Sequence, residues 1–281
     1  MDITLNTGAS IPQLGFGTYK IDDDHAPDAV AAAIAAGYRH IDTAQMYGNE
    51  AGVGKGIAAS GVRREDIFLT TKLDNPNHRP DDVRRSLGES LDRLGTHYVD
   101  LFLMHWPLPG QYDGDFITTY RVMEEFVESG EVRAIGVSNF QTHHLEKLMA
   151  ATSIVPAANQ IEIHPRFQNR TVTDYCTAHG IAVESWSPLG RGRSLTLPVI
   201  ESIAHRLGVT NAQVILAWHL AKGFVAIPKS ATPQRQIENF RAGSVVLSAE
   251  DIAVIDRLDL GERGRIGMNP DTMAHGEGAQ Q

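Results

Sequence analysis

The sequence has 281 residues, of which 42% are hydrophobic, and its net charge is −9 at pH 7. A chain of this length can bury a large core in one domain or two, while its acidic surplus argues against a surface that binds nucleic acid or an anionic membrane. No run approaches the roughly 20 apolar residues of a membrane span, and no basic segment followed by an apolar stretch begins the chain, so we expect a cytoplasmic protein.

The first predicted elements are a hairpin, a strand and a helix. Residues 3–12 favour a short hairpin with Asn6 and Gly8 in its turn. Residues 14–17 follow as a short strand. Residues 28–36 are rich in alanine and predict a helix, which Gly37 is placed to end.

A strand followed by a helix then recurs along the chain. Each predicted strand is a short apolar run that stops at a polar or aromatic residue, and buried parallel strands are apolar runs of this kind. The strands lie near residues 39–42, 67–72, 99–104, 132–137, 155–160 and 181–186, and the helices near 50–59, 81–94, 117–129, 142–150 and 170–179.

The last quarter of the chain predicts further helices around one more strand. Residues 197–221 are helical with a break at 208–210, and residues 223–227 supply the eighth strand. Thr232 is placed to cap a helix that begins at about Pro233, and Ser248 to cap a helix that ends near Leu258. We expect the tail, residues 261–281, to be a loop that lies over the barrel mouth and frays at its end.

Eight strand-helix units behind a hairpin predict a (β/α)8 TIM barrel with extra helices at the carboxyl end, and not a doubly wound sheet. No linker or low-complexity segment divides the chain, so we expect a single domain over residues 1–281. In such a barrel the chemistry lies at the carboxyl ends of the strands.

Several motifs are present only in part. Residues 15–20 begin like a dinucleotide fingerprint but lack its third glycine, and residues 52–56 lack the Ser or Thr that follows the lysine of a P-loop. His143 and His144 are adjacent, so on a helix we expect their side chains to diverge by about 100° and to make a poor metal pair. The sequence therefore predicts no metal site. The single cysteine, Cys176, excludes an intrachain disulfide, and we expect it to be a packing thiol.

Four side chains that can carry chemistry are predicted at one end of the barrel. Asp42, Lys72 and His105 stand at the carboxyl ends of the second, third and fourth strands. Tyr47 follows in the loop after Asp42. Because neighbouring strands lie about 4.8 Å apart, we expect the four side chains to converge.

This grouping suits proton transfer to or from an oxygen. A tyrosine hydroxyl has a pKa of about 10, and a lysine cation beside it favours the phenolate and lowers that pKa. Asp42 would keep Lys72 charged, and His105 could donate a hydrogen bond to an oxygen on which negative charge develops. The set therefore suits carbonyl reduction, or alcohol oxidation in reverse.

Simpler interpretations stay open for each residue. Asp42 and Lys72 could form a structural ion pair, His105 could be a satisfied histidine at a strand end, and Tyr47 could be a packing residue. A different enzyme class is a barrel lyase that uses Lys72 as a Schiff-base nucleophile.

A second cluster suits a phosphate group. Lys229 and Arg235 flank Ser230 and a predicted helix start, and cations, a hydroxyl and free backbone amides at a helix start favour a phosphate dianion. A solvated helix start is the alternative. Trp186 lies just past a strand end, which favours a ring at the barrel mouth over a ring in the core.

Longer motifs identify the sequence as similar to the aldo-keto reductase family. Residues 37–44, followed by Tyr47-Gly48-Asn49-Glu50 and Val53-Gly54, resemble the first signature of that family. Residues 227–230, followed by Arg235, Glu238 and Asn239, resemble its carboxyl-terminal signature. Residues 71–72, 105–107, 136–140 and 159–160 also fit in order. The resemblance covers about residues 3–265 and is strongest to compact bacterial members that resemble 2,5-diketo-D-gluconate reductases.

The resemblance implies NADPH-dependent reduction of aldehydes or ketones in a (β/α)8 barrel. It makes Asp42, Tyr47, Lys72 and His105 the catalytic tetrad, with Tyr47 as the proton donor. It assigns the cofactor site to Gly17, Thr18, Ser138, Asn139, Gln160, Trp186, Ser187, Leu189, Gly190, Lys229, Ser230, Arg235, Glu238 and Asn239. Within this set, Ser138, Asn139 and Gln160 would hold the nicotinamide carboxamide, and Lys229, Ser230 and Arg235 the 2′-phosphate.

The substrate pocket is the part where the sequence departs from the family. Many relatives carry Trp-Asn after Thr-Lys-Leu, where this chain has Asp74-Asn75. The resemblance places Tyr19, Asp74 and Trp106 at the pocket, with the tail near Met268. It implies a small carbonyl substrate, such as an aldehyde, a dicarbonyl or a keto-sugar, and a monomer. A non-catalytic protein that senses NADPH on the same fold remains the alternative.

Overall fold

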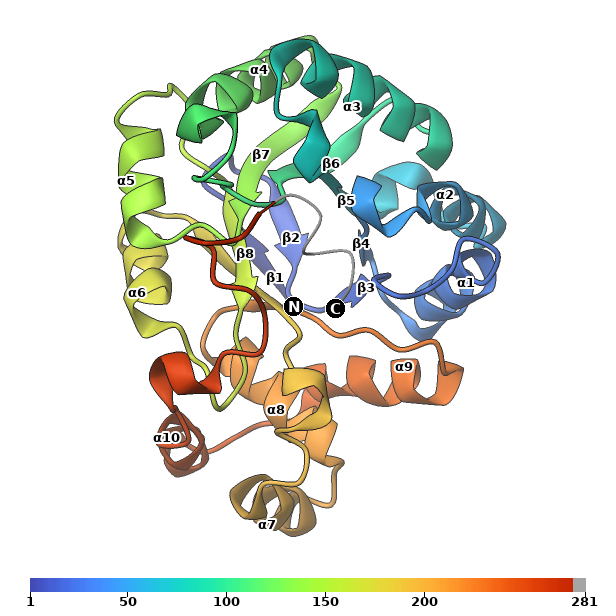
Figure 1. Cartoon of the computed structure of the whole chain (residues 1–281). Helices are drawn as coiled ribbons and strands as arrows, with labels where there is room; N and C mark the ends of the chain where they lie inside the picture. The colour runs from blue at the N-terminus through green and yellow to red at the C-terminus, as the bar shows by residue number, and fades with distance from the viewer. Residues whose placement is uncertain (275–281) are drawn as a thin grey trace.

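Eight parallel strands follow one another around a barrel in chain order, from β3 to β10 (Figure 1). The computed structural model describes residues 1–274. A bridge between Leu14 and Ala226 joins the first strand to the last. In this part of the chain the strands are β1 (Asp2–Thr4), β2 (Ser10–Pro12), β3 (Gly15–Gly17), β4 (His40–Asp42), β5 (Phe68–Leu73), β6 (Val99–Met104), β7 (Val132–Ser138), β8 (Ala158–Glu162), β9 (Ala182–Trp186) and β10 (Val225–Ile227). The predicted barrel is confirmed.

Helices surround the barrel and cover the outer faces of its strands (Figure 1). They are α1 (Ala26–Ala36), α2 (Glu50–Ala59), α3 (Pro80–Leu94), α4 (Phe116–Ser129), α5 (Thr142–Met149), α6 (Arg170–Ala178), α7 (Pro198–Leu207), α8 (Asn211–Ala221), α9 (Pro233–Phe240) and α10 (Ala249–Asp256). The main apolar core lies between these helices and the strands. None of the helices among residues 1–274 has the length and apolar character that crossing a bilayer requires.

Several boundaries differ from the prediction by a few residues, and one predicted capping bond is absent from the described residues. The strand predicted at 155–160 begins instead at Ala158, because Pro156 has no backbone N–H to give to a sheet. Ser248 caps α10 as predicted, by accepting from the backbone N–H of Asp251. Thr232 stands at the start of α9, but its side chain makes no capping bond. The oxygen of Ser230 instead accepts the backbone N–H of Thr232.

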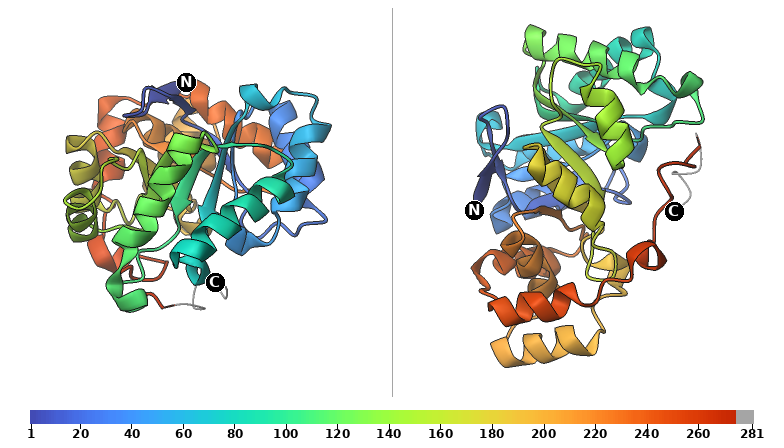
Figure 2. Two further views of the ribbon diagram at one scale, coloured as in Figure 1. Left: turned by 90° about the horizontal axis from the view of Figure 1, so that it is seen from above. Right: turned by 90° about the vertical axis from the view of Figure 1, so that its left-hand side faces the viewer.

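The two ends of the barrel are covered by different parts of the chain. The predicted hairpin, β1 and β2, closes the end at which the strands begin, where Leu5 and Ile11 pack with Phe68 and Leu101. The segment after α10 crosses the opposite end, at which the strands finish (Figure 2). The predicted frayed end of the tail falls on residues 275–281, outside the described residues.

Two buried histidines make stability depend on pH. Burial lowers the pKa of His40 to about 4 and that of His219 to about 3, from about 6.5 in an unfolded chain. Between these pKa values the unfolded chain takes up protons that the folded chain does not. The stability that the two neutral histidines contribute is therefore fully present above pH 6.5 and falls as the pH drops toward 4. The loss is up to about 1.4 kcal/mol per pH unit for each histidine.

Urea unfolding between pH 4 and 7 tests this, with His219→Gln compared with His205→Gln, since His205 is exposed on α7. We expect a shallower dependence on pH in His219→Gln and an unchanged one in His205→Gln. Equal slopes in the wild type and in His219→Gln would contradict the assignment.

Candidate active site

A pocket of about 450 Å³ opens at the end of the barrel where the strands finish. Most of the predicted site residues line it, which fits the rule that parallel strands present their chemistry at their carboxyl ends. These are Gly17, Tyr19, Asp42, Tyr47, His105, Trp106, Ser138, Asn139, Gln160, Trp186, Ser187, Leu189, Lys229 and Arg235, with Met268 from the tail.

The other predicted residues lie outside the pocket wall. They are Thr18, Lys72, Asp74, Gly190, Ser230, Glu238 and Asn239. Lys72 is fully buried directly beneath the pocket, and Thr18 donates a hydrogen bond to the backbone oxygen of Asp42. Glu238 accepts a hydrogen bond from Gln234, one turn earlier on α9.

The predicted tetrad converges around the ammonium group of Lys72. Its Nζ lies 2.6 Å from Oδ1 of Asp42 and donates to the backbone oxygen of Thr43 at 2.9 Å. It also donates to the hydroxyl of Tyr47 at 3.3 Å. The ring of His105 stands edge-on to that of Tyr47, with the centroids 5.9 Å apart. Three buried strands and one short helical turn thus bring proton-carrying groups to the floor of the pocket.

The charge state of Lys72 follows from its neighbours. Burial disfavours the ammonium form, but the Asp42 carboxylate and the Tyr47 hydroxyl outweigh it, so the pKa of Lys72 is raised. Lys72 therefore stays charged at neutral pH, as predicted.

The pKa of Tyr47 corrects the expectation that the lysine would lower it overall. Burial among protein atoms raises the pKa of Tyr47 to about 12, although Lys72 acts in the opposite direction. The tyrosine is still partly exposed at the pocket wall, so water there offsets part of this effect. At neutral pH its hydroxyl keeps its proton and can give it to an oxygen in the pocket.

His105 is neutral and has a nitrogen to spare. Burial, together with the charge of Lys72 and the nearby His78, holds the pKa of His105 well below its usual range. Its Nδ1 is buried and has no hydrogen-bond partner among the described residues. A neutral imidazole carries one N–H, which suits hydrogen bonding to an oxygen on a ligand rather than charge pairing.

Gln160 connects the tetrad to the rest of the pocket. Its side-chain nitrogen donates to Asp42 and to Glu184, both at 2.8 Å, so both amide hydrogens are in use. This arrangement leaves the carbonyl oxygen of Gln160 as the polar atom that can bind a ligand. On the neighbouring strand end, Asn139 accepts from the indole nitrogen of Trp186 at 2.8 Å, which fixes that ring at the pocket wall.

Two cations line the pocket that the sequence reasoning missed. Lys20 and Arg191 belong to the pocket wall with Lys229 and Arg235. In the described part of the chain none of these four is paired with an acidic side chain. Lys20 and Arg191 follow strand ends, and both have the left-handed φ that turns a loop sharply, at 59° and 50°. The run Gly190-Arg191-Gly192-Arg193 after a predicted strand was the available signal.

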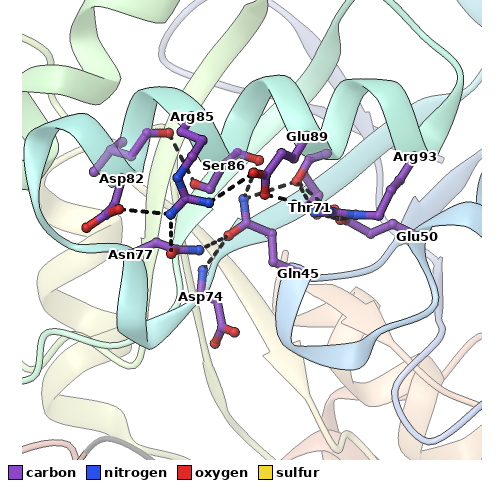
Figure 3. A network of polar contacts seen from close by, with 12 residues as sticks. Gln45, Glu50, Thr71, Asp74, Asn77, Asp82, Arg85, Ser86, Glu89 and Arg93 are labelled. Atoms are coloured by element: carbon purple, nitrogen blue, oxygen red, sulfur yellow. Dashed lines mark hydrogen bonds and ion pairs between the residues drawn. The ribbon is translucent and has the colours of Figure 1, made fainter.

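Asp74 lies beside the site without entering the pocket wall. Its carboxylate accepts the backbone N–H of Asn75, and its own backbone N–H donates to Gln45 (Figure 3). Asn77 and Arg85 continue this polar network along α3. Asp74 therefore caps the short helical turn Asn75–Asn77.

The described part of the tail closes one side of the pocket. Glu162, at the end of β8, accepts the backbone N–H groups of Ile266 and Gly267 at 2.7 and 2.8 Å. Gly267 approaches Trp186 so closely that a Cβ atom would overlap the indole ring. Further on, Met273 packs with Trp106. These contacts hold Gly267 and Met268 in the pocket wall.

The adjacent histidines of α5 do not diverge as expected. Both imidazoles reach Oδ1 of Asp271, His143 at 3.1 Å and His144 at 3.4 Å, and the three side chains could hold a metal ion by distance alone. The ring of His144 speaks against this, because its Nδ1 accepts the backbone N–H of Gln141. The proton of the neutral ring is then on Nε2, which faces Asp271, so this nitrogen has no free lone pair for a metal.

The sequence is similar to a known protein family and to individual proteins over nearly its whole length. The sequence profile of the Aldo/keto reductase family matches residues 13–260. An aldo-keto reductase of Mycolicibacterium smegmatis is 46% identical over 270 residues, covering 96% of this chain and 97% of that protein. The glyoxal reductase of Bacillus subtilis is 43% identical over 272 residues, covering 96% of each.

Solved structures agree with the sequence comparison. The crystal structure of a mutant of the protein Gox0644 in complex with NADPH superimposes with a TM-score of 0.93 at 41% identity, covering 98% of each chain. The likeness therefore extends over the barrel and the segments that build the pocket.

Proposed function

Because the chain belongs to the aldo/keto reductase family, we propose that it reduces small aldehydes and ketones with NADPH, with Tyr47 as the proton donor. The observation that carries the proposal is the contact of the charged, buried Lys72 with both Asp42 and the Tyr47 hydroxyl on the floor of an open pocket. Carbonyl reduction is the activity of the family, and the substrate and the residue roles are our proposal.

The residues around the pocket fit NADPH. Lys20, Arg191, Lys229 and Arg235 offer positive charge to its phosphate groups, in a protein that is acidic overall. Lys229 lies in the loop before α9 and Arg235 in the first turn of that helix, and both would hold the 2′-phosphate. Gln160 and Asn139 would face the carboxamide, and the fixed ring of Trp186 would cover the nicotinamide. When bound, NADPH supplies the hydride that a carbonyl carbon accepts.

The chain itself handles the carbonyl oxygen. His105 donates a hydrogen bond to this oxygen, and Tyr47 gives it a proton as negative charge develops. Lys72 stabilises the tyrosinate that remains, and Asp42 holds Lys72 in place. In the reverse direction the same tyrosine accepts the proton of an alcohol.

A lyase that forms a Schiff base on Lys72 is disfavoured. Such a nucleophile must be neutral and accessible. Lys72 is fully buried, its raised pKa keeps it charged, and all three of its hydrogens have acceptors in Asp42, Thr43 and Tyr47.

The lining of the pocket favours small carbonyl compounds, dicarbonyls and keto-sugars as the proposed substrates. Tyr19, Trp106 and Met268 surround the tetrad with mainly apolar surface, and a relative 43% identical is a glyoxal reductase. NADPH oxidation, followed by absorbance over a panel of aldehydes, dicarbonyls and keto-sugars, tests this. We expect turnover with several of them. Tight NADPH binding without turnover on any of them would favour the sensing protein instead.

Arg235 should distinguish NADPH from NADH. Replacing it by alanine removes a charge-assisted hydrogen bond to the 2′-phosphate, which is worth about 1.5–3 kcal/mol, so we expect the Kd for NADPH to rise about 10- to 100-fold. NADH lacks this phosphate, and its Kd should change little. Quenching of protein fluorescence measures both.

Arg193→Ala is a matched control, because Arg193 lies two residues after Arg191 in the same loop but does not line the pocket. It should leave both dissociation constants unchanged. Equal weakening of NADPH and NADH by Arg235→Ala would remove the 2′-phosphate assignment.

A further inference from the structure

Glu184 is a buried carboxyl group inside the barrel that the proposed chemistry does not use. It lies on β9, is fully buried, and its Oε2 accepts the side chain of Gln160 at 2.8 Å. Its Oε1 is buried without a hydrogen-bond partner among residues 1–274. A buried carboxyl oxygen without a partner is costly, so the position calls for a physical explanation.

The side-chain amide group of Gln160 connects Glu184 to the tetrad. The side-chain nitrogen of Gln160 donates to Glu184 on one side and to Oδ2 of Asp42 on the other, at 2.8 Å each. Asp42 in turn holds Lys72 at 2.6 Å, and Lys72 reaches Tyr47. A continuous chain of hydrogen bonds therefore runs from Glu184 to the hydroxyl that we propose as the proton donor.

Asp42 and Glu184 are two carboxyl groups that share a single nearby cation, Lys72. The charged groups that act on Glu184 are Asp42 and Lys72, from strands β4 and β5. Its neighbour in the register on β8 is Gln160, which is neutral, and its neighbour on β10 is the apolar Val225. If both carboxyls were ionised, the barrel interior would hold a net negative charge, which a low-dielectric environment disfavours.

We propose that Glu184 is a positioning residue that fixes the orientation of Gln160 and takes up a proton in preference to Asp42, so that its charge adjusts the proton affinity of Tyr47. The inference rests on the proposed role of Tyr47. Of the two carboxyls, Glu184 holds the proton because Asp42 has the direct ion pair with Lys72. Burial and the nearby Asp42 raise the pKa of Glu184 to about 7, in agreement with this geometry.

The consequence for the reaction has a definite sign. Below neutral pH Glu184 is protonated and adds no charge. Above neutral pH, the negative charge on Glu184 opposes the positive charge of Lys72. Tyr47 therefore holds its proton more tightly. In carbonyl reduction the wild type therefore keeps its proton donor to a higher pH than a variant without this carboxyl group.

Glu184→Gln tests the electrostatic part, since glutamine can still accept from Gln160. We expect the rate of carbonyl reduction to match the wild type at pH 6, where Glu184 of the wild type is protonated and residue 184 is therefore neutral in both proteins. The alkaline limb of the pH profile should move to lower pH by roughly one unit. Glu184→Leu, which also removes the acceptor, should in addition weaken NADPH binding at every pH because Gln160 loses an anchor.

Infrared spectroscopy of the protein without ligand gives a readout that does not depend on activity. The C=O stretch of a protonated carboxyl should disappear as the pH rises through neutrality in the wild type, and Glu184→Gln should lack this titrating band. Glu50→Gln is the matched control, since Glu50 is also buried but lies in the polar network around α3 with Arg93 at 2.7 Å (Figure 3). It should retain both the titrating band and the wild-type pH profile.

The possible failures are distinguishable. Absence of a titrating band that Glu184→Gln removes would overturn the proposal, whatever the activity. A band that titrates as expected, together with an unchanged pH profile, would leave Glu184 as a structural group and overturn its link to Tyr47. Failure of Tyr47→Phe to impair reduction would instead count against the proposed function.

Discussion

Replacing Tyr47 by phenylalanine is expected to reduce carbonyl turnover by about 10²- to 10⁴-fold, the usual contribution of a positioned general acid. The loss should appear in kcat, because the ring and its edge-on contact with His105 remain while the hydroxyl group that Lys72 contacts is removed. NADPH binding should be unaffected. Absorbance assays and fluorescence titration measure the two quantities separately.

Tyr19→Phe is the matched control for this variant. Tyr19 lines the same pocket, and its ring centroid lies 5.0 Å from that of Tyr47, but Lys72 donates its three hydrogens to Asp42, Thr43 and Tyr47. Its hydroxyl should be dispensable for turnover. Loss of activity in Tyr19→Phe with retention in Tyr47→Phe would exchange the roles of the two tyrosines.

The convergence of Asp42, Lys72 and His105 was predictable because it depends mainly on backbone geometry. Parallel strands that end at the same side of a barrel bring their last residues together. Asp42 ends β4, Lys72 is the last residue but one of β5, and His105 follows β6. The strand at Ala158 was placed too early, since an apolar run does not reveal where hydrogen bonding to the next strand begins.

Properties that depend on several distant groups were beyond the sequence. The effect of Lys72 on the pKa of Tyr47 was predicted with the right direction, but the larger effect of burial depends on atoms from all sides of the pocket. The meeting of His143 and His144 on Asp271 likewise depends on where the tail crosses α5. The position of Glu184 beside the tetrad could not be predicted for the same reason. A single glutamate in an apolar strand does not show that it shares a hydrogen-bond partner with Asp42.

Replacing Lys72 by methionine is expected to cost both stability and activity. The carboxylate of Asp42 would remain buried without its cation, and breaking a buried ion pair in this way typically lowers the free energy of unfolding by about 3–5 kcal/mol. Urea unfolding at pH 7 measures this difference from the wild type.

The double variant Asp42→Asn with Lys72→Met separates the structural from the chemical role of the pair. It removes both charges, so most of the lost stability should return, since two neutral side chains of similar size leave no buried ion unpaired. Turnover should not return, because Tyr47 would still lack the cation that stabilises its phenolate. Recovery of turnover together with stability would mean that Asp42 and Lys72 form only a structural ion pair, which is the simpler interpretation that their sequence positions alone left open.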